Sequence, residues 1–224
     1  MRLARSPSAV IFDLDGTLVD AESWWDEVRA SFAAAHGRPW SPLDQAAVMG
    51  ANSRGWGAIM RRRLDLELSV DEIVDAIVSA MTERYRTHGA PRIPGAEEAV
   101  RRLASAGMPM AVASAGHCAV IEAALAGLGI AELFRAVVSA DQVARGKPAP
   151  DVFLLAAELL GVEPIDCLVV EDSLNGVLAG RAAGMTVVLI PNQAVPPAAG
   201  AAQAASLVLD SLDGLDVLLR LPAT

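Results

Sequence analysis

Short apolar runs recur along the chain, each three to five residues long and bounded by polar or glycine-containing segments. Runs that are apolar at every position are typical of strands buried on both faces of a parallel sheet. The runs that fit this description are Ala9–Phe12, Met110–Ala113, Ala136–Val138, Leu168–Val170 and Thr186–Ile190.

The segments between the later runs repeat apolar residues every three and four positions, which is the pattern of an amphipathic helix. These segments are Glu97–Ser105, Ala119–Leu128, Asp151–Leu160 and Leu174–Ala183. Strands that alternate with helices favour crossover connections between parallel strands. The sequence therefore predicts an α/β fold with a doubly wound parallel sheet.

The stretch from residue 21 to residue 92 interrupts this alternation, because its pattern is helical throughout. The expected helices are Glu22–His36, Leu43–Met49, Gly57–Leu64 and Ser69–His88. All four tryptophans lie in this stretch, and a linker rich in glycine and proline, Gly89–Gly95, ends it. We expect an α-helical domain at 21–92, inserted after the first strand into a core domain made of 1–20 and 93–224.

Composition narrows the class of protein. The 224 residues are 53% hydrophobic and 20% charged, which suits a folded chain rather than a disordered one. No run is long and apolar enough to span a membrane, and the N-terminal apolar run is short for a secretory signal. Cys118 and Cys167 stand alone, so neither a zinc framework nor a disulfide scaffold is expected. We expect a cytoplasmic protein with no membrane partner, and a monomer.

The formal net charge of −9 argues against nucleic acid as a partner, because a phosphate backbone is bound by a basic surface. Only one of the 18 basic residues is a lysine, Lys147, which stands between Gly146 and Pro148. Because every other basic residue is an arginine, the lysine at this position is a candidate functional residue.

Polar side chains follow the apolar runs, at the sheet edge where open α/β folds bind ligands. They are Asp13 and Asp15 after the first run, Ser114 after the second, Lys147 beyond the third, and Glu171 and Asp172 after the fourth. Four carboxylates in one pocket repel each other and need a cation, and such oxygen-rich sites suit Mg²⁺. Lys147 adds a compact positive charge that faces an anion. The chemistry that fits this set is phosphoryl transfer.

These motifs resemble those of hydrolases in the haloacid dehalogenase superfamily that carry a helical cap after the first strand. The resemblance covers nearly the whole chain and rests on Asp13–Leu18, Ser114, Gly146–Asp151 and Glu171–Gly176. Within the superfamily, the chain is most similar to the β-phosphoglucomutase-like subgroup, which contains many sugar phosphatases. The resemblance implies a Rossmann-like core, a cap at 21–92 and a Mg²⁺-dependent phosphatase. Its substrate would be a small phosphate ester, cleaved through an aspartyl-phosphate intermediate.

The resemblance also assigns roles. Asp13 is the expected nucleophile and Asp15 the expected general acid and base. Ser114 and Lys147 are expected to hold the phosphoryl oxygens. Ser114 could instead cap the following helix, and Asp15 could be an ordinary turn residue.

The same resemblance implies a set of metal ligands. Asp13 and Asp172 would bind Mg²⁺ through their carboxylates, and Asp15 through its backbone carbonyl. Glu171 would bind either directly or through a water molecule. Asp172 or Ser173 could also cap the next helix, which is compatible with metal binding.

Two residues of the inserted segment are candidates for substrate contact. Arg54 resembles a substrate-contacting arginine of the cap, although its motif is displaced by one residue, and it could equally be a solvated surface residue. Trp25 follows the turn after Asp15 and could face the substrate, although tryptophans here could also form the core of the cap.

Alternative functions remain at this point. A phosphomutase of the β-phosphoglucomutase type would carry a histidine near Trp25 and a lysine where this chain has Gly116 and His117. Both departures favour a phosphatase. A binding or regulatory protein without activity is disfavoured, because the full set of catalytic residue types is present.

Overall fold

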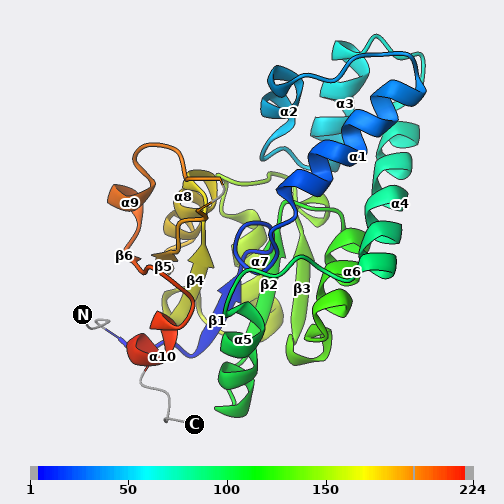
Figure 1. Ribbon diagram of the computed structural model, residues 1–224. Coiled ribbons are helices and arrows are strands. Elements are labelled where there is room, and N and C mark those ends of the chain that lie inside the picture. The colour runs from blue at the N-terminus through cyan, green and yellow to red at the C-terminus, as the bar shows by residue number, and fades with distance from the viewer. Residues whose placement is uncertain (1–4, 194, 220–224) are drawn as a thin grey trace.

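The computed structural model describes residues 5–193 and 195–219 (Figure 1). Its described strands form one parallel sheet of six in the order β3-β2-β1-β4-β5-β6. The strands are β1 (Ala9–Phe12), β2 (Met110–Ser114), β3 (Ala136–Ser139), β4 (Cys167–Glu171), β5 (Thr186–Leu189) and β6 (Leu207–Val208). The order reverses at β1, as in a doubly wound sheet, which confirms the predicted fold class.

Five of these strands coincide with the predicted apolar runs. The ends differ mainly because β2, β3 and β4 continue into Ser114, Ser139 and Glu171, which are polar but buried. Those polar residues are part of the strand ladders and face the edge of the sheet where ligands bind. The sequence analysis missed β6, because this strand has only two residues and is too short to show a hydrophobic pattern.

Helices cover both faces of the sheet. Val10 and Phe12 pack in an apolar cluster with one set of helices, whereas Ala9 and Ile11 pack in a second cluster with the other set. The first face is covered by α5 (Ala96–Ser105), α6 (Cys118–Leu128) and α10 (Gly214–Leu219), and the second by α7 (Asp151–Leu160), α8 (Leu174–Ala182) and α9 (Ala201–Ala204). Both faces of each central strand are therefore buried, which explains why the strands are apolar at every position. Nothing in the described part of the chain is a helix of the length and apolarity that a membrane crossing requires.

The segment between β1 and α5 is helical and lies over one end of the sheet (Figure 1). It comprises α1 (Glu22–Ala35), α2 (Pro42–Val48), α3 (Ser53–Arg63) and α4 (Val70–His88). Helix α3 begins four positions before the predicted Gly57, because the Asn52 side chain accepts a hydrogen bond from the Gly55 backbone N–H at 2.9 Å and caps the helix there.

Two connections join this segment to the sheet, and they run side by side. The Asp20 N–H donates to the Pro91 carbonyl at 2.9 Å, and the Ile93 N–H donates to the Leu18 carbonyl at 3.2 Å. Helix α4 packs along α6, and one apolar cluster continues from the sheet into the insert. The division into a cap at 21–92 and a core at 1–20 and 93–224 stays a prediction, and residues 1–4, 194 and 220–224 of that core lie outside the described residues.

Candidate active site

A cavity of about 370 Å³ opens between the carboxyl ends of the strands and the inserted helices. It brings together nearly all of the side chains that the sequence analysis singled out. Those that line it are Asp13, Asp15, Trp25, Ser114, Lys147, Glu171 and Asp172. They come from the ends of β1, β2 and β4, from the loop between β3 and α7 and from α1, so the crossover topology assembles the site.

Lys147 lies at the centre of the charged groups. Its ammonium forms an ion pair with the Asp13 carboxylate and a second one with Glu171, whose Oε1 lies 2.7 Å from Nζ. Burial by itself lowers the pKa of Lys147, but the attraction of the two carboxylates outweighs it, so the pKa is raised. Lys147 is therefore a permanent positive charge beside Asp13.

Glu171 is fully buried and both of its carboxylate oxygens are engaged. Oε1 faces Lys147, and Oε2 accepts hydrogen bonds at 2.9 Å from the backbone N–H groups of Asp172 and Ser173 and from the Ser173 hydroxyl. A Cβ atom at Gly176 would collide with the Glu171 carboxylate. Only glycine at this position of α8 leaves room for the Glu171 side chain. Glu171 is thus held rigidly behind the other acidic groups.

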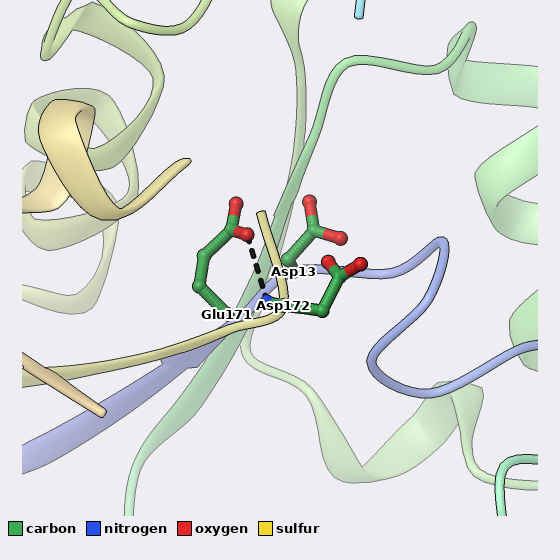
Figure 2. Close-up of side chains that lie close together, drawn as sticks. All are labelled: Asp13, Glu171 and Asp172. Atoms are coloured by element: carbon green, nitrogen blue, oxygen red, sulfur yellow. Dashed lines mark hydrogen bonds between the residues drawn. The ribbon is translucent and has the colours of Figure 1, made fainter. Parts of the chain in front are cut away.

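Three carboxylates lie close together at this edge of the sheet (Figure 2). Asp13, Glu171 and Asp172 each offer an oxygen, and these oxygens lie within 4.8 Å of one another. Burial raises the pKa of Asp13 and of Asp172, and repulsion between the carboxylates raises both further. Buried oxygen ligands of this kind suit a hard divalent cation, so the residues fit the Mg²⁺ that the family uses.

The turn after β1 brings the backbone close to Asp172. Gly16 adopts a positive φ of 89°, and a Cβ atom at this position would collide with the Asp172 carboxylate. The Thr17 hydroxyl approaches Asp172 Oδ1 at 3.5 Å. Gly16 is therefore required both by the turn and by the space that the carboxylate occupies.

Asp15 occupies a different environment from Asp13, although only one residue separates them. Its Oδ1 accepts a hydrogen bond from the Trp25 indole Nε1 at 3.3 Å. Loss of water around the carboxyl raises the pKa of Asp15 to about 6; the Trp25 hydrogen bond opposes this shift and repulsion from Glu22 adds to it. A carboxyl with this pKa can donate and accept protons near neutral pH.

Ser114 ends β2 with its side chain buried in the cavity wall. Its hydroxyl oxygen accepts a hydrogen bond from the Gly116 N–H at 3.0 Å. The cap of α6 is His117, whose Nδ1 accepts from the Ala119 N–H at 3.3 Å. Ser114 is therefore not the helix cap that the sequence analysis kept as an alternative.

The structure places Arg54 away from the other candidate residues. Arg54 is exposed on α3, forms an ion pair with Asp71 at 3.1 Å, and lies outside the residues that line the cavity. The arginine that does line it is Arg29 on α1, which the sequence analysis missed. The signal was present, because Arg29 follows Trp25 by four positions and shares its face of the helix.

This fold and this site define a class of hydrolases that work at the carboxyl edge of a parallel sheet, beneath an inserted helical segment. The model of the haloacid dehalogenase-like hydrolase family matches residues 7–184, and the chain belongs to this family.

Relatives with assigned activities agree with this membership. Hexitol phosphatase A of Escherichia coli K12 is 36% identical over 211 residues, which cover 92% of each chain. A bifunctional riboflavin kinase/FMN phosphatase of Arabidopsis thaliana is 33% identical over 97% of this chain, which spans 56% of that longer protein. A crystal structure of CbbY from Rhodobacter sphaeroides in complex with phosphate superimposes with a TM-score of 0.81 at 25% identity, covering 93% of this chain and 96% of the other.

Proposed function

We propose that the protein is a Mg²⁺-dependent phosphatase that hydrolyses a small phosphorylated metabolite, in particular a sugar phosphate, through a phosphorylated Asp13. The observation that carries this proposal is the buried ion pair between Asp13 and Lys147 at the end of β1. This pair sets a carboxylate beside a fixed positive charge at one point of the cavity, which supports a nucleophilic role for Asp13. An anionic phosphoryl group can approach a carboxylate only where such charge offsets their repulsion.

In the first step an Asp13 carboxylate oxygen attacks phosphorus and the bond from phosphorus to the ester oxygen breaks. Protonated Asp15 gives its proton to the departing alkoxide, which leaves as an alcohol. In the second step Asp15, now ionised, takes a proton from water, and the water oxygen attacks the same phosphorus. The bond between Asp13 and phosphorus then breaks, which releases inorganic phosphate and restores both carboxyl groups.

Ser114 and Lys147 would hold the phosphoryl oxygens during both steps. The Ser114 hydroxyl still has its hydrogen to donate, since its oxygen is the acceptor in the bond from Gly116. Lys147 lies between Asp13 and Glu171, so an oxygen next to Asp13 would also lie next to the ammonium.

Asp13 and Asp172 would hold Mg²⁺, with the Asp15 backbone carbonyl as the further ligand that the family implies. Ionised Asp13, Glu171 and Asp172 together with Lys147 carry a net charge of −3 + 1 = −2, which one divalent cation neutralises. Both oxygens of Glu171 already accept hydrogen bonds, which supports a role through water or through Asp172 rather than direct binding. When bound, the cation offsets negative charge on the transferring phosphoryl group.

Two features support a phosphatase over a phosphomutase. Near the place where the mutases carry a histidine, this chain has Trp25, whose indole N–H donates to Asp15. The relatives named for hexitol phosphate and FMN are phosphatases, which supports a small phosphorylated metabolite as the substrate.

The proposal is tested with Asp13→Asn, since an amide cannot attack phosphorus. We expect hydrolysis of p-nitrophenyl phosphate in Mg²⁺ to fall by at least about 1,000-fold, corresponding to some 4 kcal/mol of barrier. Circular dichroism should remain that of the unchanged protein. Asp75→Asn, an exposed aspartate of α4, is the matched control and should keep full activity. Residual activity of Asp13→Asn above about 1% would contradict the role of Asp13 as nucleophile.

A further inference from the structure

Arg29 is a buried cation in the wall of the cavity. Only 6% of the residue is exposed, and its guanidinium lies over two indole rings, 4.9 Å from the centre of the Trp25 ring and 5.7 Å from that of Trp56. The two rings meet edge to face with centroids 6.4 Å apart. The tryptophans therefore hold the plane of the guanidinium.

The hydrogen-bonding capacity of this guanidinium is mostly unused. Among the described residues, its only side-chain hydrogen bond runs from Nη1 to Gln45 Oε1 at 3.1 Å, and its buried Nε has no partner. No carboxylate of the described residues forms an ion pair with it. A buried charge with unpaired donors is costly, so its presence in a cavity wall calls for a ligand that accepts those hydrogen bonds.

Arg29 lies on the side of the cavity where the leaving group must be. Trp25, one helical turn before Arg29, donates to the Asp15 carboxyl, and Asp15 would protonate the leaving oxygen. The Arg29 charge also acts on Asp15 and lowers its pKa slightly against the effect of burial. Groups attached to the ester oxygen would therefore extend from Asp15 towards Arg29.

The charge around Arg29 favours hydroxyl groups over an anion. Glu22 lines the same cavity, and its carboxylate accepts a hydrogen bond from Gln45 Nε2 at 2.6 Å. Gln45 thus joins Glu22 to Arg29, so this wall presents both acceptors and donors, and acidic groups offset the Arg29 charge. A second anionic group on the substrate would meet Glu22 and Asp15 as well as Arg29. Hydroxyl groups, which donate and accept, complement all of them.

We propose that Arg29 determines substrate specificity by donating hydrogen bonds to hydroxyl groups of an uncharged polyol or sugar leaving group. This inference rests on the phosphatase function proposed above and assigns the leaving-group site, which that function leaves open. Trp25 and Trp56 hold the guanidinium, and Gln45 sets its orientation.

The test compares a hexitol 6-phosphate, whose leaving group carries hydroxyls, with p-nitrophenyl phosphate, which has none. Arg29→Met should lower kcat/KM for the hexitol phosphate by about 10- to 100-fold, the effect of losing hydrogen bonds from a charged donor. The same variant should change p-nitrophenyl phosphate hydrolysis by less than about 3-fold, because that ester makes no such bonds. Arg29→Lys, which keeps the charge, should recover part of the loss. The readout is the ratio of kcat/KM for the two substrates, measured on one preparation. A loss of folded enzyme lowers both values equally and leaves this ratio unchanged.

Arg84→Met is the matched control. Arg84 lies 4.6 Å from the centre of the Trp24 ring, so it repeats the stacking of Arg29 on the inserted helices but outside the cavity lining. Arg84→Met should leave the ratio of kcat/KM for the hexitol phosphate to that for p-nitrophenyl phosphate unchanged. Phosphoglycolate, with an anionic leaving group, forms the third arm, and its kcat/KM should fall less in Arg29→Met than that of the hexitol phosphate.

An equal loss for all three esters would overturn the proposal, since Arg29 would then be structural. A greater loss for phosphoglycolate would overturn it in favour of anion recognition. Binding of hexitol 6-phosphate to Asp13→Asn with Mg²⁺, followed by calorimetry, separates this inference from the proposed function. Binding weakened about 10-fold or more by Arg29→Met would uphold the inference even if the unchanged protein hydrolysed no ester. If all three esters are hydrolysed and none depends on Arg29, the phosphatase function is upheld and the inference about Arg29 is wrong.

Discussion

Asp13 and Asp15 illustrate how two aspartates separated by one residue acquire different chemistry. The Asp13 carboxylate faces Lys147 at the end of the strand, whereas Asp15 lies beyond the first turn and binds the Trp25 indole. The ion pair with Lys147 lowers the pKa of Asp13 and so favours its nucleophilic, ionised form, although burial outweighs this effect and leaves the pKa raised. A single neutral hydrogen bond in a dry pocket leaves the other carboxyl with a pKa of about 6, suited to proton transfer.

Trp25→Phe should move the pH profile of the reaction. The Trp25 hydrogen bond stabilises the ionised form of Asp15, so its loss should raise the pKa of Asp15. In the proposed mechanism Asp15 acts first as an acid, so kcat/KM should fall as pH rises through its pKa. The alkaline limb for a hexitol phosphate should therefore shift to higher pH by about 0.5 to 1 unit, the equivalent of one net hydrogen bond.

The measurement is kcat/KM between pH 5 and pH 8.5, and the shift between variants is the readout because the substrate phosphate also ionises in this range. Trp40→Phe is the control, since Trp40 Nε1 donates to Asp26 at 2.8 Å away from the cavity. The alkaline limb of the Trp40→Phe profile should lie at the same pH as in the unchanged protein. A limb that stays in place or moves to lower pH in Trp25→Phe would refute the assigned contact.

Sequence reasoning could locate the charged groups but not their partners. Residues directly after apolar runs, such as Asp13 and Ser114, were predictable because parallel strands end at one edge of a sheet. The hydrogen bond between Trp25 and Asp15 and the placement of Arg29 depend on how α1 tilts over the sheet. Arg54 lies on α3, which begins earlier than its apolar pattern indicates, and pairs with Asp71 outside the cavity lining, as the solvated alternative expects.

At the scale of elements, one contact joins the inserted helices to the sheet on the side facing the cavity. The Asp141 carboxylate, in the short helical turn after β3, accepts a hydrogen bond from the Ser53 N–H at 3.1 Å. Ser53 is the first residue of α3, where backbone N–H groups lack partners within the helix. The preceding Ser139 hydroxyl donates to the Gly116 carbonyl at 2.6 Å, so the same turn also supports the loop after Ser114.

Asp141→Ala should loosen this junction. Loss of a hydrogen bond to a charged acceptor costs about 1.5–3 kcal/mol at most, so amide hydrogen exchange at Ser53 should accelerate by about 10-fold or more. The substrate cavity would be held closed less firmly, so kcat/KM for a hexitol phosphate should fall by a few-fold. Asp75→Ala on α4 serves as the control. Unchanged exchange at Ser53 would show that Asp141 does not hold α3.

The elements themselves were largely predictable, and the exceptions have physical causes. Helix α7 matches its predicted range, Asp151–Leu160, because Pro150 begins it and Gly161 in the left-handed conformation ends it. Helices α9 and α10 and strand β6 were not predicted. All three are short, so tertiary contacts rather than periodicity define them.

Over the whole molecule, the inserted segment makes more contacts with the core on one side than on the other. The paired connections at Asp20 and Pro91 and the packing of α4 on α6 lie on the first side. The loop between α2 and α3, which includes Met49 and Gly50, lines the cavity on the other side. Motion of the insert about the connections would therefore open the cavity at the α2–α3 side, where the bond between Ser53 and Asp141 would break.

The buried acidic cluster should make the stability of the whole fold depend on pH and on Mg²⁺. Asp13, Asp15 and Asp172 all have raised pKa values in the folded protein, mainly through burial. The folded state therefore retains protons that the unfolded chain releases from about pH 4 upward. Without a divalent cation, these three groups should destabilise the fold increasingly as pH rises from about 4 towards 8.

Under the proposed function, Mg²⁺ would bind the ionised carboxylates of the folded state only, so it should stabilise the protein more at pH 8 than at pH 5. At 100 times its Kd the gain is about 2.7 kcal/mol, which raises the Tm of a chain of this size by about 5–10 °C. Thermal melts at both pH values, with chelator and with Mg²⁺, measure this directly. Asp172→Asn removes one of the repelling charges and one ligand, so its Tm should vary less with pH and respond less to Mg²⁺. Asp75→Asn should behave like the unchanged protein and correct for all other titrating groups. A Mg²⁺ shift equal at pH 5 and pH 8, or equal in Asp172→Asn, would mean that the cation does not bind at this cluster.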